Sequence, residues 1–165
     1  MADQNFPILD GLAPSWADVT VKADIDGGSL ITIDDIASIN TGTTVTEGRK
    51  KGATGGRVRK RTRGSQEDTA SMSVYLEGYT QLVAKLAKLA PQRGKQRRIS
   101  LVTFTLEYMY SLPDDAAIFH TQARGCRVLG RDLNDSEGEE ATKVDVALSV
   151  MEVVDIVGGD EIVML

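Results

Sequence analysis

Arg57-Val58-Arg59-Lys60-Arg61-Thr62-Arg63-Gly64 opens the stretch of sequence that decides the fold. This run carries five cations and ends at a glycine. Directly after it, Met72, Val74 and Leu76 alternate with serine and tyrosine residues, which is the period of two expected for a half-buried strand. The stretch therefore predicts a basic segment that leads into a strand.

An amphipathic helix is predicted immediately after this strand. Leu82, Leu86 and Leu89 recur at spacings of four and three residues, so they lie on one face of a helix. Lys85 and Lys88 fall outside the apolar stripe and should face water. We expect this helix to cover about residues 78–90 and to be the one helix against which the remaining strands fold.

The rest of the chain has the patterns of β-structure. We expect roughly six to eight strands in all, and the predicted fold class is mainly β: a β-sandwich or barrel with one flanking helix and a long basic loop over residues 48–64. An alternative for residues 57–63 is that they extend the hairpin. Gly125 is predicted to form a bulge. The predicted strands outside the opening stretch cover residues 16–25, 30–33, 36–47, 97–110, 117–129 and 143–154.

The domain organisation follows from the same patterns. Residues 1–15 contain two prolines and scattered apolar side chains, which predicts an extended arm. Residues 16–157 form one predicted domain, and residues 158–165 a short apolar tail that needs a covering strand. No signal peptide and no membrane span are expected from the sequence.

Charge is distributed unevenly along the chain. Residues 49–63 hold eight of the 19 basic residues and no acid, so the remainder carries a net charge of −13. Such a segment can bind nucleic acid or an acidic face of another copy of the chain. Candidate contact residues between copies are these cations and the acids of the predicted loop 131–142: Arg49, Lys50, Lys51, Arg57, Arg59, Lys60, Arg61, Arg63, Asp132, Asp135, Glu137, Glu139 and Glu140.

Residues for catalysis or for holding a cofactor are scarce. His120 and Cys126 are the single histidine and the single cysteine, which excludes an internal disulfide and the usual zinc sites. Both lie in one predicted strand six residues apart, too far for a dyad. Gly52 to Arg57 resembles a phosphate loop in composition but lacks the Gly-Lys-Ser/Thr ending. We therefore predict no enzyme, no metal site and no cofactor.

The order of these features resembles phage tail tube proteins, which share their fold group with the tubes of contractile injection systems. Many members carry an Arg-Thr-Arg-Gly-like motif, a polar segment and a short strand that leads into a single helix. The matching residues here are Arg61-Thr62-Arg63-Gly64, residues 65–70, residues 71–75 and residues 82–89. At motif level the resemblance covers residues 57–90.

The resemblance implies a structural virion protein. Copies are expected to form rings, usually of six, that stack into a tube through which DNA passes into the host without specific binding. Implied partners are further copies, the tape-measure, baseplate and tail-terminator proteins, and a sheath if the tail contracts. The implied location is the virion, after assembly in the host cytoplasm.

Two alternatives remain open on the sequence. One is a nucleic-acid-binding β-domain that uses residues 49–63, although that segment has no aromatic residue on which bases could stack. The other is a secreted ring protein of a bacterial injection system with the same fold.

Overall fold

The computed structural model describes residues 19–28, 30–51, 58–110, 119–135, 137–138 and 140–164. Within these ranges the chain forms a nine-stranded antiparallel sheet, a separate two-stranded hairpin and one α-helix. The elements are β1 (Val19–Ile25), β2 (Leu30–Thr32), β3 (Ile36–Lys51), β4 (Val58–Tyr75), α2 (Leu76–Leu89), β5 (Gln92–Arg93), β6 (Gln96–Arg97), the 3-10 turn η2 (Ile99–Leu101), β7 (Phe104–Tyr110), β8 (Phe119–Asn134), β9 (Lys143–Ser149), β10 (Glu152–Val157) and β11 (Asp160–Ile162). The predicted mainly β fold with a flanking helix is confirmed.

Strand β8 divides the large sheet into two sections. Its residues 120–124 pair with β10 on one side and lie beside β7 on the other, whereas residues 127–134 pair with β9. We call β2, β1, β7, the first part of β8, β10 and β11 the first section, and the second part of β8, β9, β4 and β3 the second section. Gly125 lies between them with a φ of +66° and a shift in register, so the predicted bulge is confirmed.

The core lies between the two sections and beneath α2. Alternate side chains of β1 and β9, among others, point inward, as the period of two requires. Phe104, Val74 and Val144 are fully buried, and from the helix Leu82 and Leu86 join them. Burying one such side chain stabilises the fold by roughly 1.5–3 kcal/mol.

Helix α2 ends just before Pro91. Its last turn is followed by Ala90 in an extended conformation, the conformation that the next residue, Pro91, imposes on its predecessor. At the other end Gly78 lies so close to β4 that a Cβ atom there would approach Val74 Cγ1 to 2.8 Å. The absence of a side chain at residue 78 therefore lets the helix pack directly on the sheet.

The predicted long basic loop is largely strand. Strand β3 continues to Lys51 and β4 begins at Val58, and the two pair with each other along nearly their whole length. Residues 52–57 lie outside the described residues. The loop prediction was wrong about residues 48–51 and 58–64. The backbone N–H and C=O groups of these segments form hydrogen bonds with the partner strand, and this pairing does not depend on apolar side chains. Residues 58–68 of β4 pair with β3 alone, and we call residues 43–51 and 58–68 the projecting hairpin.

Three other predicted boundaries also differ. Strand β8 runs to Asn134, so the acidic loop begins four residues later than predicted. The predicted strand 143–154 is two strands, because the chain turns between Ser149 and Glu152. The predicted strand 97–110 begins as β6 and η2 before β7 starts. The predicted arm, residues 1–15, lies outside the described residues.

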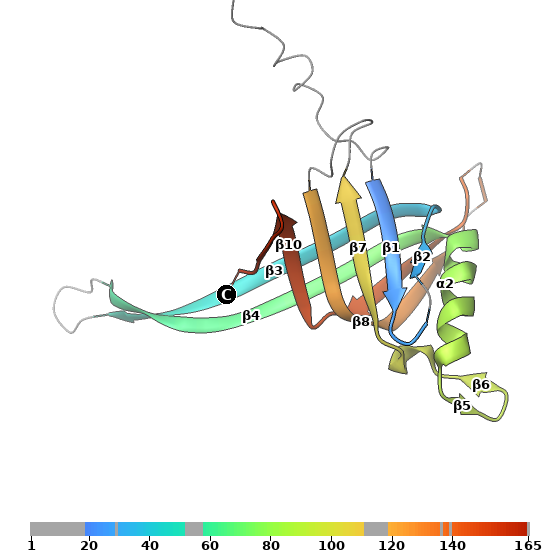
Figure 1. Ribbon diagram of the computed structural model, residues 1–165, viewed down its shortest axis with the longest axis horizontal. Coiled ribbons are helices and arrows are strands. Elements are labelled where there is room, and N and C mark those ends of the chain that lie inside the picture. Colours follow the sequence, from blue (N-terminus) through green and yellow to red (C-terminus); the bar gives the residue numbers. More distant parts are fainter. Residues whose placement is uncertain are drawn as a thin grey trace, which may run out of the picture.

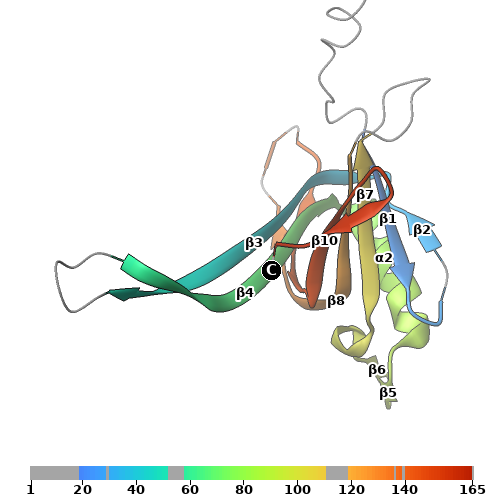
Figure 2. The same ribbon diagram turned by 60° about the vertical axis from the view of Figure 1, so that its left-hand side comes forward.

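Figures 1 and 2 show how these parts are arranged. The projecting hairpin extends far to one side of the body, while α2 lies on the opposite side. The β5–β6 hairpin lies at the lower end of the body in both views, and the connection from β8 to β9 lies at the upper end.

Candidate assembly surfaces

The projecting hairpin concentrates positive charge far from the body. The backbone register places Arg49 opposite Arg61 and Lys50 opposite Lys60. Arg49 and Arg61 are both exposed, and like charges directly opposite each other destabilise a strand pair. The single described ion pair on this hairpin joins Arg61 to Glu47 at 3.9 Å. The hairpin therefore carries a surplus of cations that an acidic partner would stabilise.

The other predicted cations divide into two groups. Arg57 lies outside the described residues, as does the acid Glu139. The backbones of Lys51, Arg59, Lys60 and Arg63 lie in strands β3 and β4, but the structure does not describe their side chains. The predicted contact role of these residues stays a prediction.

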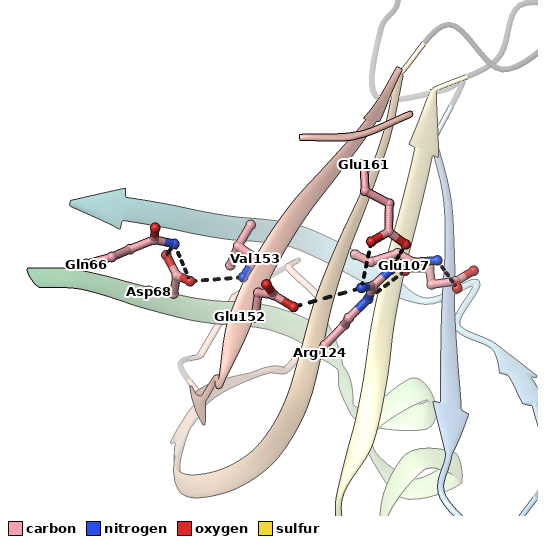
Figure 3. A network of polar contacts seen from close by, with 8 residues as sticks. Gln66, Asp68, Glu107, Arg124, Glu152, Val153 and Glu161 are labelled. Carbon is pink, nitrogen blue, oxygen red and sulfur yellow. Dashed lines mark hydrogen bonds and ion pairs between the residues drawn. The ribbon is translucent and has the colours of Figure 1, made fainter. Parts of the chain in front are cut away.

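The base of the projecting hairpin is fixed to the first section of the sheet. The Asp68 carboxylate accepts a hydrogen bond from the backbone N–H of Val153 at 3.0 Å and two from the Gln66 side-chain amide (Figure 3). On β3, the hydroxyl of Thr41 lies 2.7 Å from that of Tyr108. These contacts join the two sections at the place where the hairpin leaves the body, and so they set its direction.

The predicted acids gather between β8 and β9. Asp132 lies in β8, and Asp135, Glu137 and Glu140 follow between β8 and β9; we call these four predicted acids, together with Asp145 of β9, the acidic connection. All four are exposed, and within the described residues only Glu140 has a cationic partner, Lys143 at 3.8 Å. A surface hollow of about 340 Å³ lies here, lined by Leu133, Asn134, Asp135, Glu140, Ala141, Thr142, Lys143 and Asp145.

The second section of the sheet has two long open edges. Among the described strands, β3 pairs only with β4, and residues 127–134 of β8 pair only with β9. Leu129 and Leu133 on that part of β8 are 69% and 51% exposed. An edge with free backbone groups and exposed leucines is a template for another strand. The sequence pattern did not reveal this edge, because which strands lie at an edge depends on the order of the strands in the sheet.

A second polar network holds the C-terminal strand β11. The Arg124 guanidinium on β8 donates to Gln122 and to both carboxylate oxygens of Glu161, and it lies 3.8 Å from Glu152 (Figure 3). The Gln122 side-chain amide donates in turn to Glu107 at 2.7 Å. Arg124 lowers the pKa of Glu161 through this hydrogen bond and through its charge. Charge pairing thus supports a strand that has only three residues of backbone register.

His120 and Cys126 have separate contacts in the structure. Cys126 is fully buried and its thiol donates to the Ala123 carbonyl, and burial raises the pKa of that thiol to about 11. His120 Nε2 lies 3.7 Å from a Glu107 oxygen. Within the described ranges, no group of three or more His, Cys, Asp or Glu side chains is placed to hold a metal ion. No described helix has the length and apolar character needed to cross a membrane.

The fold is shared with solved tube structures. No family model and no curated protein matches the sequence. A chain of the sheath–tube complex of the PVC extracellular contractile injection system in its extended state matches with a TM-score of 0.64 at 9% identity, over 94% of this chain and 98% of that one. A chain of the anti-feeding prophage baseplate matches with 0.62 at 10% identity, over 88% and 97%.

A third solved structure, the SPP1 tail tube, matches with a TM-score of 0.57 at 16% identity, over 87% of this chain and 78% of that one. At such low identity these likenesses concern the backbone arrangement alone. The resemblance expected from residues 57–90 is thus confirmed at the level of the fold, and this chain has the fold of tail tube proteins.

Proposed function

We propose that this chain is a structural tube subunit whose copies join side by side into rings and whose rings stack into a tube. The observation that carries the proposal is the pair of open edges on the second section of the sheet. Without a partner strand, those edges leave two rows of backbone hydrogen-bonding groups unpaired within the described chain.

The directions of the four strands allow these edges to meet. Each strand in the order β3, β4, β9, β8 is antiparallel to the next, so β3 and the second part of β8 run in opposite directions. When β8 of one copy lies beside β3 of the next, the new pair is therefore antiparallel as well. Such a contact is head-to-tail, and it closes into a ring when the rotation between copies fits. Six copies are the expectation from the resemblance.

The outer face of these strands suits the wall of a channel. Its exposed positions are mainly small and uncharged, including Ser38, Asn40, Thr44, Thr69, Ser71 and Ala147. The described charged side chains on this face include Glu67, Asp132 and Asp145 against Arg127 and Lys143, which leaves a surplus of one acid. A surface with few cationic side chains and a net negative charge does not bind DNA tightly, so DNA can pass along it.

The projecting hairpin then reaches a neighbouring copy. Figure 1 shows it directed away from the body, so that its cations are presented to another molecule. Reversal of Arg49 and Arg61 to glutamate is expected to weaken assembly. On this proposal the protein belongs to a virion tail, its tube ends contact the tape-measure, baseplate and terminator proteins, and a sheath surrounds the tube if the tail contracts.

Electron microscopy of the purified protein tests the proposal. We expect rings and stacked tubes at raised concentration from the wild-type chain. L129K/L133K places two charges on the open β8 edge and should leave only monomers with an unchanged circular dichroism spectrum. L30K/I162K is the matched control, because both of those side chains are exposed but belong to β2 and β11 of the first section. Monomeric wild-type protein, or rings from L129K/L133K, would refute the proposal.

The surplus of cations on the hairpin also favours a second candidate, nucleic-acid binding. Opposed like charges would be neutralised by phosphates with a steep dependence on salt. A titration of DNA at roughly physiological salt separates the two candidates: tight binding that R49E/R61E abolishes supports the second. The remaining alternative, a ring protein of a bacterial injection system, shares the fold and the assembly test and differs only in cargo and genomic context.

A further inference from the structure

A second basic surface lies at the lower end of the body, separate from the projecting hairpin. The chain contains no acid from residue 78 to residue 106, and within that span six cations lie close together in sequence. We call them the basic end: Lys85, Lys88, Arg93, Lys95, Arg97 and Arg98. They lie on the last turns of α2 and on the β5–β6 hairpin (Figures 1 and 2).

Local contacts hold the basic end in a defined shape. The Arg97 guanidinium donates to the Ala87 carbonyl in the last turn of α2 at 2.9 Å, which fixes β6 against the helix. The Arg98 N–H donates to the Pro91 carbonyl, and Gly94 supplies the positive φ of +62° that the tight turn needs. A surface that is already ordered loses little conformational entropy when it binds a partner.

The cations of the basic end lack acidic partners in the described part of the chain. None of the six forms an ion pair with a described carboxylate, and four of them lie on the exposed segment 91–98. Leu89 and Leu101 nearby are 41% and 50% exposed. Charge and apolar surface together are the composition of a contact surface rather than of a merely solvated loop.

The complementary surface lies at the opposite end of the same body. The acidic connection is at the upper end in both views, whereas β5–β6 is at the lower end, and the strands of the first section run between them. Asp135, Glu140 and Asp145 line the hollow described above, whose volume of about 340 Å³ is large enough to admit the end of an arginine or lysine side chain. Asp132, Asp135 and Glu137 have no described cationic partner.

We propose that the basic end of one copy binds the acidic connection of the next copy along the strand direction, with Arg93 or Lys95 entering the acidic hollow. This inference rests on the self-assembly proposed above and assigns the contact that stacks one ring on another. It gives the acidic connection a partner other than the projecting hairpin. A second copy is favoured over nucleic acid because the matching acids are on the same chain, because residues 85–98 contain no aromatic side chain, and because the net charge of −5 opposes a polyanion.

Charge exchange tests the proposal on the full-length protein. R93E/K95E and D135K/E137K should each weaken stacking of rings by at least about tenfold in concentration, measured by sedimentation velocity and electron microscopy at low salt. The combined variant R93E/K95E/D135K/E137K restores complementarity with exchanged signs, so it should stack like the wild type. That recovery also excludes misfolding as the cause of the losses in the two parent variants.

The hairpin variant R49E/R61E is the discriminating comparison. Combined with D135K/E137K, it should not restore stacking, and recovery in that combination would overturn the proposal by assigning the acidic connection to the hairpin. Rings that stack normally despite R93E/K95E would also overturn it while leaving the proposed function intact. Absence of any rings from the wild type refutes both. Tight DNA binding at roughly physiological salt that only R93E/K95E removes would identify the basic end as a nucleic-acid surface instead.

Discussion

Replacing Gly125 with alanine should be one of the most damaging single-methyl changes in the chain. Gly125 has a φ of +66°, where a residue with a Cβ atom costs roughly 1–2 kcal/mol. A Cβ atom there would also approach Met151 Cγ to 2.5 Å and Met151 Cβ to 2.8 Å, closer than such atoms pack. Overpacking of this kind adds about 1–3 kcal/mol, so the expected loss in the free energy of unfolding is about 2–5 kcal/mol.

Two further variants separate the contributions to this loss. Gly27 has a φ of +73°, but no atom lies within 4 Å of the place that a Cβ atom would take, so Gly27→Ala should cost only the backbone part, roughly 1–2 kcal/mol. Combining Gly125→Ala with Met151→Gly removes both close contacts and should recover the overpacking part. The measurement is urea unfolding followed by circular dichroism. Equal losses for Gly125→Ala and Gly27→Ala would refute the reasoning that the β8 bend leaves no room at residue 125.

The remaining predictions concern the core, the thiol and the C-terminal strand. Leu82→Ala should cost about 2–5 kcal/mol in urea unfolding because Leu82 is 1% exposed, whereas Leu89→Ala should cost less than about 1 kcal/mol. Burial raises the pKa of the Cys126 thiol to about 11, so the free energy of unfolding should be unaffected by this group below about pH 9 and should fall by up to roughly 3 kcal/mol as the pH rises toward 11. In Cys126→Ala, that part of the decrease in the free energy of unfolding with pH should be absent. Glu161→Gln should speed amide hydrogen exchange in β11 at about pH 7, and since Arg124 lowers the pKa of Glu161, the wild type should lose its extra protection only as the pH falls through that lowered pKa.

Much of the fold could be predicted where side chains alternate between core and solvent. The strand that ends at Ile25 and the helix with Leu82 and Leu86 both follow from local patterns, and the structure confirms them over the described residues. The projecting hairpin did not follow, because residues 46–50 and 61–62 are exposed at successive positions, so the sequence there shows no alternation between apolar and polar side chains. Strand pairing there is satisfied by the backbone alone, which a pattern of side chains does not record.

Some of the candidate surfaces could be predicted from the sequence and others could not. Charge identified residues 49–63 and the acids near residue 135 from the sequence, but only the strand order revealed the open edge at Leu129. The basic end was visible in principle, since no acid lies between residues 78 and 106. The helical pattern, however, indicates only that Lys85 and Lys88 belong to the wet face of a helix. Their proximity to Arg97 depends on the hydrogen bond to Ala87.

The Asp68 carboxylate lies at the base of the projecting hairpin, so a small rotation there moves the tip by a large distance. From Asp68 to Val58 the chain advances ten residues along a strand, which is about 33 Å at roughly 3.3 Å per residue. A swing of about 10° at the Val153 contact would therefore carry the tip through about 6 Å, more than the spacing between neighbouring strands of roughly 4.8 Å. A small change in the Asp68 contact, or in the Thr41–Tyr108 contact beside it, would thus move the distant tip by a full strand spacing, and a polymer would repeat that shift at every copy.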